Sequence, residues 1–257
     1  MTRAWRLTDA DWNSWPDGLS DTETLDQIAD LGLVGVELGV YDAAVELAPD
    51  RLAALAAGPV PVTALLLSLP ADRWSDGALS GDVDRLVEQV QACASVCRSL
   101  GLTVLGLWPG ADPVGADVVD GRRRCVEAAG DVRLALEYKP ETAVQTAAEA
   151  VALCRAVPGL GVLLDTGHAY AVQEDPGEVV ALLGELLLHC HLGDAAPGGG
   201  DDDLPCGRLH DLGSFVRALD ASGFAGTASF DLYGAVSSGA VSGREAVLES
   251  RDHVLSR

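Results

Sequence analysis

Polar side chains suited to metal binding and proton transfer end several apolar runs of this chain. These ends read Val36-Glu37-Leu38, Leu136-Glu137-Tyr138-Lys139-Pro140, Leu164-Asp165-Thr166-Gly167-His168, Leu188-His189-Cys190-His191 and Phe230-Asp231. Polar groups at the ends of apolar strands are costly unless they bind something. Four successive runs supply three carboxylates and one imidazole, which form a ligand set for a divalent cation. The candidate ligands are Glu137, Asp165, His191 and Asp231.

Several of these residues also have a purely structural interpretation. Glu137 could pair with Lys139 on the same strand face, and Asp165 could cap the turn that follows it. Strand alternation places His189 and His191 on one face. We predict that His191, nearer the end of its run, is the ligand and that His189 is a hydrogen-bonded core residue.

The only lysine of the chain, Lys139, lies two residues after Glu137. An ammonium is a compact point charge whose pKa shifts on burial, and a guanidinium cannot replace it in that respect. Trp108 ends another apolar run, where it could form a hydrophobic wall against a sugar ring or be a plain core residue.

Eight short apolar runs alternate with amphipathic stretches, of which Asp21–Asp30 and Asp82–Leu100 are the predicted helices. Continuous apolar character indicates strands buried on both faces, and hence parallel strands covered by helices. Eight such units favour an α/β fold of the (β/α)8 TIM-barrel type over an open doubly wound sheet, as one domain spanning residues 1–257. The predicted strands are Trp5–Thr8, Leu33–Leu38, Val60–Leu67, Thr103–Trp108, Val132–Glu137, Gly161–Asp165, Leu186–His191 and Gly226–Leu232.

Composition limits the classes of partner and the compartment. A formal charge of −22 makes binding to a nucleic acid backbone implausible, and we interpret the one basic cluster, Arg122-Arg123-Arg124, as a solvated helix face. The six cysteines form no CxxC pair and are expected to be reduced and mostly buried. With no signal region and no membrane-spanning run, we expect a cytoplasmic protein that binds no membrane.

Taken in order, these motifs resemble the sugar phosphate isomerase/epimerase superfamily, also called xylose isomerase-like TIM barrels. The resemblance rests mainly on Asp165-Thr166-Gly167-His168 together with His191-Leu192-Gly193-Asp194. It implies a cation held by one ligand from each of strands five to eight, here Glu137, Asp165, His191 and Asp231. We expect Mn²⁺, with Mg²⁺ and Co²⁺ as alternatives.

The resemblance also implies catalytic roles. Glu137 and Asp231 would move protons on opposite sides of the substrate carbon through an enediolate, with Lys139 and His168 contacting substrate oxygens. Asp231 stands where glutamate is usual, which leaves open whether it reaches a substrate proton as well as the metal. Further candidate substrate contacts are Glu37, Trp108 and Arg208.

The expected activity is a metal-dependent sugar isomerase or epimerase acting on a small-molecule sugar or sugar derivative. The alternatives are a lyase or deglycosylase acting on oxidised 3-keto sugars and a sugar-binding barrel without turnover. Apurinic endonucleases of the superfamily are argued against by the five histidines and the charge of −22. Whether the chain forms a homo-oligomer stays open.

Overall fold

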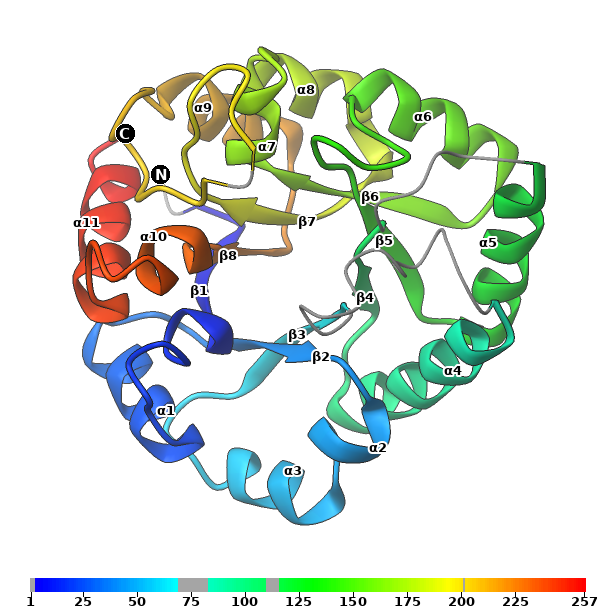
Figure 1. Ribbon diagram of the computed structural model, residues 1–257, viewed down its shortest axis with the longest axis horizontal. Helices are drawn as coiled ribbons and strands as arrows, with labels where there is room; N and C mark the ends of the chain where they lie inside the picture. The colour runs from blue at the N-terminus through cyan, green and yellow to red at the C-terminus, as the bar shows by residue number, and fades with distance from the viewer. Residues whose placement is uncertain (1–2, 69–82, 110–115, 201) are drawn as a thin grey trace.

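A computed structural model describes residues 3–68, 83–109, 116–200 and 202–257 of the chain. Eight parallel strands close into a barrel in sequence order, and helices surround it (Figure 1). Closure comes from the pairing of the first and last strands, with Arg6 opposite Thr227 and Asp9 opposite Phe230. The strands are β1 Arg6–Ala10, β2 Val36–Val40, β3 Val62–Leu67, β4 Val104–Leu107, β5 Arg133–Glu137, β6 Leu160–Asp165, β7 Leu187–Leu192 and β8 Thr227–Phe230. The predicted TIM barrel is confirmed.

The helices begin where the sequence offers capping residues. Ser20, Thr146 and Ser242 each form a capping box with a glutamate three residues later. The helices are α1 Asp21–Asp30, α2 Ala43–Glu46, α3 Pro49–Ala56, α4 Val83–Leu100, α5 Ala116–Ala129, α6 Ala147–Ala156, α7 Thr166–Ala171, α8 Pro176–Leu183, α9 Gly213–Ser222, α10 Tyr233–Ser237 and α11 Gly243–Leu255, with 3₁₀ turns η1 Asp11–Asn13 and η3 Gly184–Leu186. Both predicted helices are observed, although Asp82 lies outside the described residues. In the described part of the chain, no helix is both long and apolar enough to cross a membrane.

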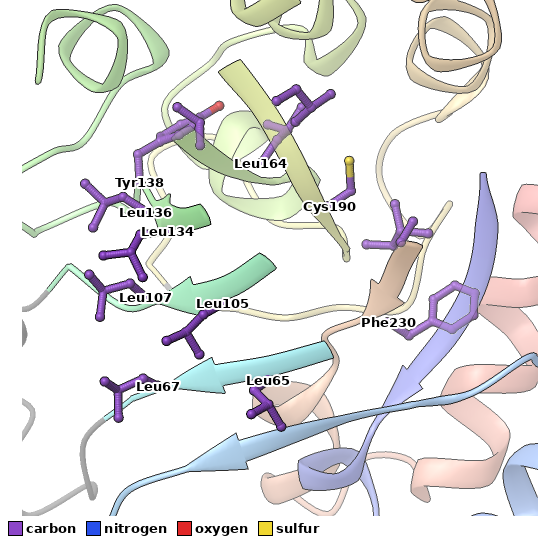
Figure 2. Packing of buried hydrophobic residues seen from close by; sticks show 14 of the residues in the cluster. Leu65, Leu67, Leu105, Leu107, Leu134, Leu136, Tyr138, Leu164, Cys190 and Phe230 are labelled. Carbon is purple, nitrogen blue, oxygen red and sulfur yellow. The ribbon is translucent and has the colours of Figure 1, made fainter. Parts of the chain in front are cut away.

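The main core lies between the strands and the helices. Alternate residues of neighbouring strands point the same way and pack side by side, as Figure 2 shows for leucines of β3, β4 and β5. Cys190 belongs to this layer, as predicted from its alternation with His189 and His191. All six cysteines are buried and unbridged. The strand residues between these outward-facing positions, polar residues among them, face the barrel interior.

Three predictions about strand ends and one about charge were wrong. β1 continues past Thr8 to Ala10, β2 continues past Leu38 to Val40, and β8 ends at Phe230 rather than Leu232. Glu37 therefore lies within its strand, and Asp231 lies just beyond its own. In the extension of β2, Trp15 closely covers Gly39, where an added Cβ would lie 3.0 Å from its ring. Arg122 is not solvated: it is 1% exposed, on the inward face of α5.

The physical reason for the buried arginine is helical spacing. Arg122 shares its face of α5 with Cys125 and Ala129, which are also buried. Burial lowers the pKa of the Arg122 guanidinium to about 10. Its neighbours Arg123 and Arg124 do face solvent, where they pair with Asp120 and Asp84.

Candidate metal centre and substrate pocket

The four predicted ligands come together at the carboxyl ends of the last four strands. Glu137 and Asp165 end β5 and β6, His191 is the penultimate residue of β7, and Asp231 follows β8. Each offers one ligand atom, and these four atoms lie within 4.8 Å of one another. From His191 Nδ1, the nearest carboxylate oxygens are 3.1 Å away on Glu137, 3.5 Å on Asp231 and 4.0 Å on Asp165.

Asp165 combines the two roles considered for it. Its Oδ1 caps α7 by accepting a hydrogen bond of 2.9 Å from the backbone N–H of His168. Its Oδ2 is buried and has no hydrogen-bond partner among the described residues. A buried carboxylate oxygen without a hydrogen-bond partner is costly, so this atom is suited to bind a cation at the centre of the cluster.

The pKa shifts in the cluster also indicate a site suited to positive charge. Burial alone would lower the pKa of His191, but the carboxylates of Glu37 and Glu137 hold it well above its ordinary value. Burial alone would raise the pKa of Glu137, but the hydrogen bond with His191 and the nearby His168 hold it below its ordinary value. Both pKa shifts come from the carboxylates and imidazoles that pack against one another in this cluster.

A pocket of about 620 Å³, partly open to solvent, lies against the cluster. Glu137 and Asp231 reach into it from the metal centre, and Lys139 places its Nζ 5.7 Å from the centre of the Trp108 ring. Aromatic rings and a few polar groups are the usual lining of a small-molecule site. The other lining residues are Trp12, Gly39, Tyr41, Leu66, Ser68, Asp203 and Tyr233.

Of the other predicted site residues, some join this site and some do not. His168 is buried and does not line the pocket, but its Nδ1 lies 3.6 Å from Glu137 Oε1. Glu37 is fully buried below His191 and does not line the pocket. Arg208 points away: its Nη2 donates to Glu249 Oε2 at 2.7 Å on the exposed surface. Because that ion pair holds the guanidinium outside the pocket, we leave Arg208 out of the proposed site.

Sequence reasoning missed Trp12 and Asp203. The Trp12 indole donates to Asp231 Oδ1 at 2.8 Å, which leaves Asp231 Oδ2 facing His191. Trp12 lies two residues after the end of β1, in the turn η1, so a correct end for that strand would have placed it on the rim. Asp203 has a positive φ of 42° and caps α10 through Gly234 at 2.9 Å, a contact that no pattern in the sequence indicates.

The sequence profile of the xylose isomerase-like TIM barrel family matches residues 25–254. This chain belongs to that family. A search among curated protein sequences finds no match.

Solved structures give a consistent picture of the family fold. D-allulose 3-epimerase from Methylomonas sp. superposes with a TM-score of 0.74 at 18% identity, covering 99% of this chain and 98% of its own. The IolI protein with a bound zinc atom gives 0.74 at 18%, covering 98% and 97%. A 3-keto-D-glucoside 4-epimerase from E. coli gives 0.73 at 14%, covering 96% and 99%. Such identities show a shared fold, so the reaction must be argued from this chain's own site.

The family implies a divalent cation, and the residues of this xylose isomerase-like barrel fit one. Ligand bonds of about 2.0–2.2 Å place neighbouring ligand atoms about 3 Å apart and opposite ones about 4 Å apart. The separations of 3.1, 3.5 and 4.0 Å around His191 Nδ1 lie in this range. One imidazole and three carboxylates suit Mn²⁺, Mg²⁺, Co²⁺ or Zn²⁺ rather than a soft, thiolate-bound ion.

Proposed function

We propose that this protein is a divalent-metal-dependent sugar epimerase or isomerase, which moves a proton on the carbon next to a carbonyl. The observation that carries the proposal is a cluster of four ligand atoms within 4.8 Å of one another, two of whose residues also line a pocket. When bound there, a divalent cation would polarise the substrate carbonyl and stabilise negative charge that develops on its oxygens. Metal-dependent proton transfer is the chemistry that this combination serves best.

Glu137 is the proposed base. Its carboxylate is buried, lines the pocket and has a pKa below the ordinary value, so it is ionised at neutral pH and able to accept a proton. Desolvation strengthens its interaction with a substrate held in the pocket. The proton would leave the carbon next to the substrate carbonyl and pass to a Glu137 oxygen.

Asp231 is the proposed partner on the other side of the substrate. It lines the same pocket, and its side chain is 15% exposed against 3% for Glu137. The Trp12 indole holds one oxygen, which fixes the plane of the carboxylate. In an epimerase this residue would return a proton to the opposite face of the carbon, and in an isomerase to the neighbouring atom.

Lys139 is the proposed donor to the substrate oxygens, whereas His168, which does not line the pocket, would act through the neighbouring Glu137. Lys139 is 8% exposed and lines the pocket, where an ammonium stabilises developing negative charge far better than in water. The aromatic walls suit the apolar face of a sugar ring. The bound cation would offset the charges of Glu137 and Asp231, and among the described lining residues Asp203 offsets the single ammonium, which favours an uncharged sugar over a sugar phosphate.

The test is turnover of candidate sugars by metal-free and metal-loaded protein in D₂O. A panel of free ketoses, the corresponding sugar phosphates and 3-keto glycosides covers the substrate classes in question. We expect Mn²⁺-dependent conversion of an uncharged substrate, with deuterium entering at the carbon next to the carbonyl. Retention of the original hydrogen would contradict the proton-transfer mechanism. Release of the aglycone from a 3-keto glycoside would identify a lyase instead, and binding of sugar without any turnover a binding protein.

A further inference from the structure

A second layer of polar residues fills the barrel interior directly below the proposed metal centre. Glu37 of β2 is 0% exposed there, and its Oε2 lies 2.7 Å from His189 Nε2 and 3.2 Å from His191 Nε2. This carboxylate does not line the substrate pocket. A direct contact between Glu37 and substrate, as the sequence suggested, is therefore not what the geometry supports.

The two ring nitrogens of His191 face different surroundings. Nδ1 faces the carboxylates of Glu137, Asp165 and Asp231, whereas Nε2 faces Glu37. A histidine binds a metal through a nitrogen lone pair, so the proton must be on the other nitrogen. Glu37 is placed to accept a hydrogen bond from that proton and so to keep the Nδ1 lone pair directed at the metal centre.

His189 is oriented so that it supports the same assignment. Its Nδ1 lies 3.2 Å from Thr227 Oγ1, deep in the barrel. If the Thr227 hydroxyl donates to Nδ1, then Nε2 carries the ring proton of His189 and donates to Glu37. One oxygen of Glu37 then accepts hydrogen bonds from both imidazoles. The hydrogen bonds thus form a continuous chain from Thr227 through His189 and Glu37 to His191 at the proposed metal centre.

We propose that Glu37 is a positioning residue that acts through His191 to strengthen binding of the divalent cation. The inference rests on the proposed function, because it concerns the same metal centre. Carboxylates that accept the second N–H of a metal-bound histidine fix its tautomer and raise its basicity, and their loss costs about 10–100-fold in metal affinity.

The cost of burying Glu37 argues against a merely structural role. Its Oε1 is buried with no hydrogen-bond partner among the described residues. Its Oε2 lies within hydrogen-bond distance of both His189 Nε2 and His191 Nε2. A buried carboxylate with one unpartnered oxygen is costly, so its presence at this position points to a use beyond packing. The negative charge is useful when a cation lies on the far side of His191.

A second ion between Glu37, His189 and His191 is the main competing interpretation, because their ligand atoms also lie within 4.8 Å of one another. A neutral imidazole has a lone pair on only one nitrogen, so His191 cannot bind an ion on both sides. The hydrogen-bond separation of 2.7 Å between His189 and Glu37 fits a proton between them. We therefore expect one ion per chain.

The experiment compares Mn²⁺ binding by wild-type protein and Glu37→Gln, using calorimetry on metal-free protein. We expect one site per chain in both, with affinity about 10–100-fold weaker in the variant. Thermal unfolding of the metal-free proteins should show a cooperative transition for both, which establishes that Glu37→Gln folds. The control is Asp9→Asn, assayed at pH 8 so that it also removes a buried negative charge. Asp9 makes its hydrogen bonds with Asn13 and Ala10 rather than with His191, so affinity should change by less than about threefold.

Each other outcome has a definite meaning. Unchanged affinity in a folded Glu37→Gln would overturn the positioning role. Two ions per wild-type chain would make Glu37 a ligand instead. Absence of Mn²⁺ binding by the wild type would remove the proposed function itself. If Glu37→Gln does not fold, Thr227→Val decides: it should weaken Mn²⁺ binding by about two- to tenfold, and unchanged affinity would refute the inference.

Discussion

Replacing Asp9 by asparagine should stabilise the protein at pH 8 and change its stability little at pH 4. Asp9 is 0% exposed on β1, where its Oδ1 accepts hydrogen bonds from Asn13 Nδ2 at 2.8 Å and the Ala10 N–H at 2.9 Å. Its Oδ2 is buried without a hydrogen-bond partner in the described part of the chain. An asparagine can keep both accepted bonds through its own carbonyl oxygen, so only the charge is removed.

The size of the effect follows from the pKa of Asp9. Burial raises it from 3.8 to about 7, against the lowering effect of the hydrogen bonds from Asn13 and Ala10. Each pKa unit corresponds to 1.36 kcal/mol, so ionising Asp9 in the folded state costs about 4 kcal/mol. Below pH 3.8 both states are protonated and there is no cost. As pH rises to 7 the unfolded state ionises first, so wild-type stability falls through this window and stays low above it.

Urea unfolding of metal-free wild type and Asp9→Asn between pH 4 and pH 8 measures this difference. The free energy of unfolding of the variant should exceed that of wild type by up to about 4 kcal/mol at pH 8, and the gain should disappear towards pH 4. An equal gain at both pH values would show that packing rather than charge is responsible. No gain at pH 8 would mean that Asp9 is ionised in the folded state without cost, which would refute the reasoning.

Two further predictions concern the reacting groups. Glu137→Gln, measured at saturating Mn²⁺, should lower kcat by about 10²–10⁴ and abolish deuterium incorporation from solvent, because the amide cannot accept the substrate proton. Full activity of this variant would exclude Glu137 as the base. Lys139→Met should lower kcat by about 10²–10³ and leave Mn²⁺ affinity within about threefold, because the ammonium is proposed to contact substrate oxygens and not the ion. A higher KM with unchanged kcat would instead limit Lys139 to substrate binding.

Much of the fold and of the ligand cluster could be predicted from the sequence because parallel barrel strands place their carboxyl ends on one rim. Glu137, Asp165, His191 and Asp231 each fall at or next to a strand end that apolar runs mark clearly. Alternation then separates His191 from the outward-facing Cys190 without any knowledge of the tertiary structure.

The remaining features depend on contacts that local patterns do not encode. β2 passes beyond Leu38 to Val40, where Trp15 covers Gly39, and this extension places Glu37 below the rim. Arg122 is one of three consecutive arginines, and only its face of α5 decides that it is buried. Arg208 lies in a loop outside the pocket and pairs with Glu249 of α11, a contact between segments far apart in the sequence.

The two halves of the barrel contribute unequally to the site. Every proposed metal ligand comes from β5 to β8, whereas the first four strands and the segments after them supply much of the wall, namely Trp12, Gly39, Tyr41, Leu66, Ser68 and Trp108. Reaction type and substrate preference are thereby encoded in largely separate stretches of the gene. If the proposed function holds, evolution could remodel the wall in the amino-terminal half and retain the proposed ligands and proton-transfer residues, so that one chemistry would serve many sugars.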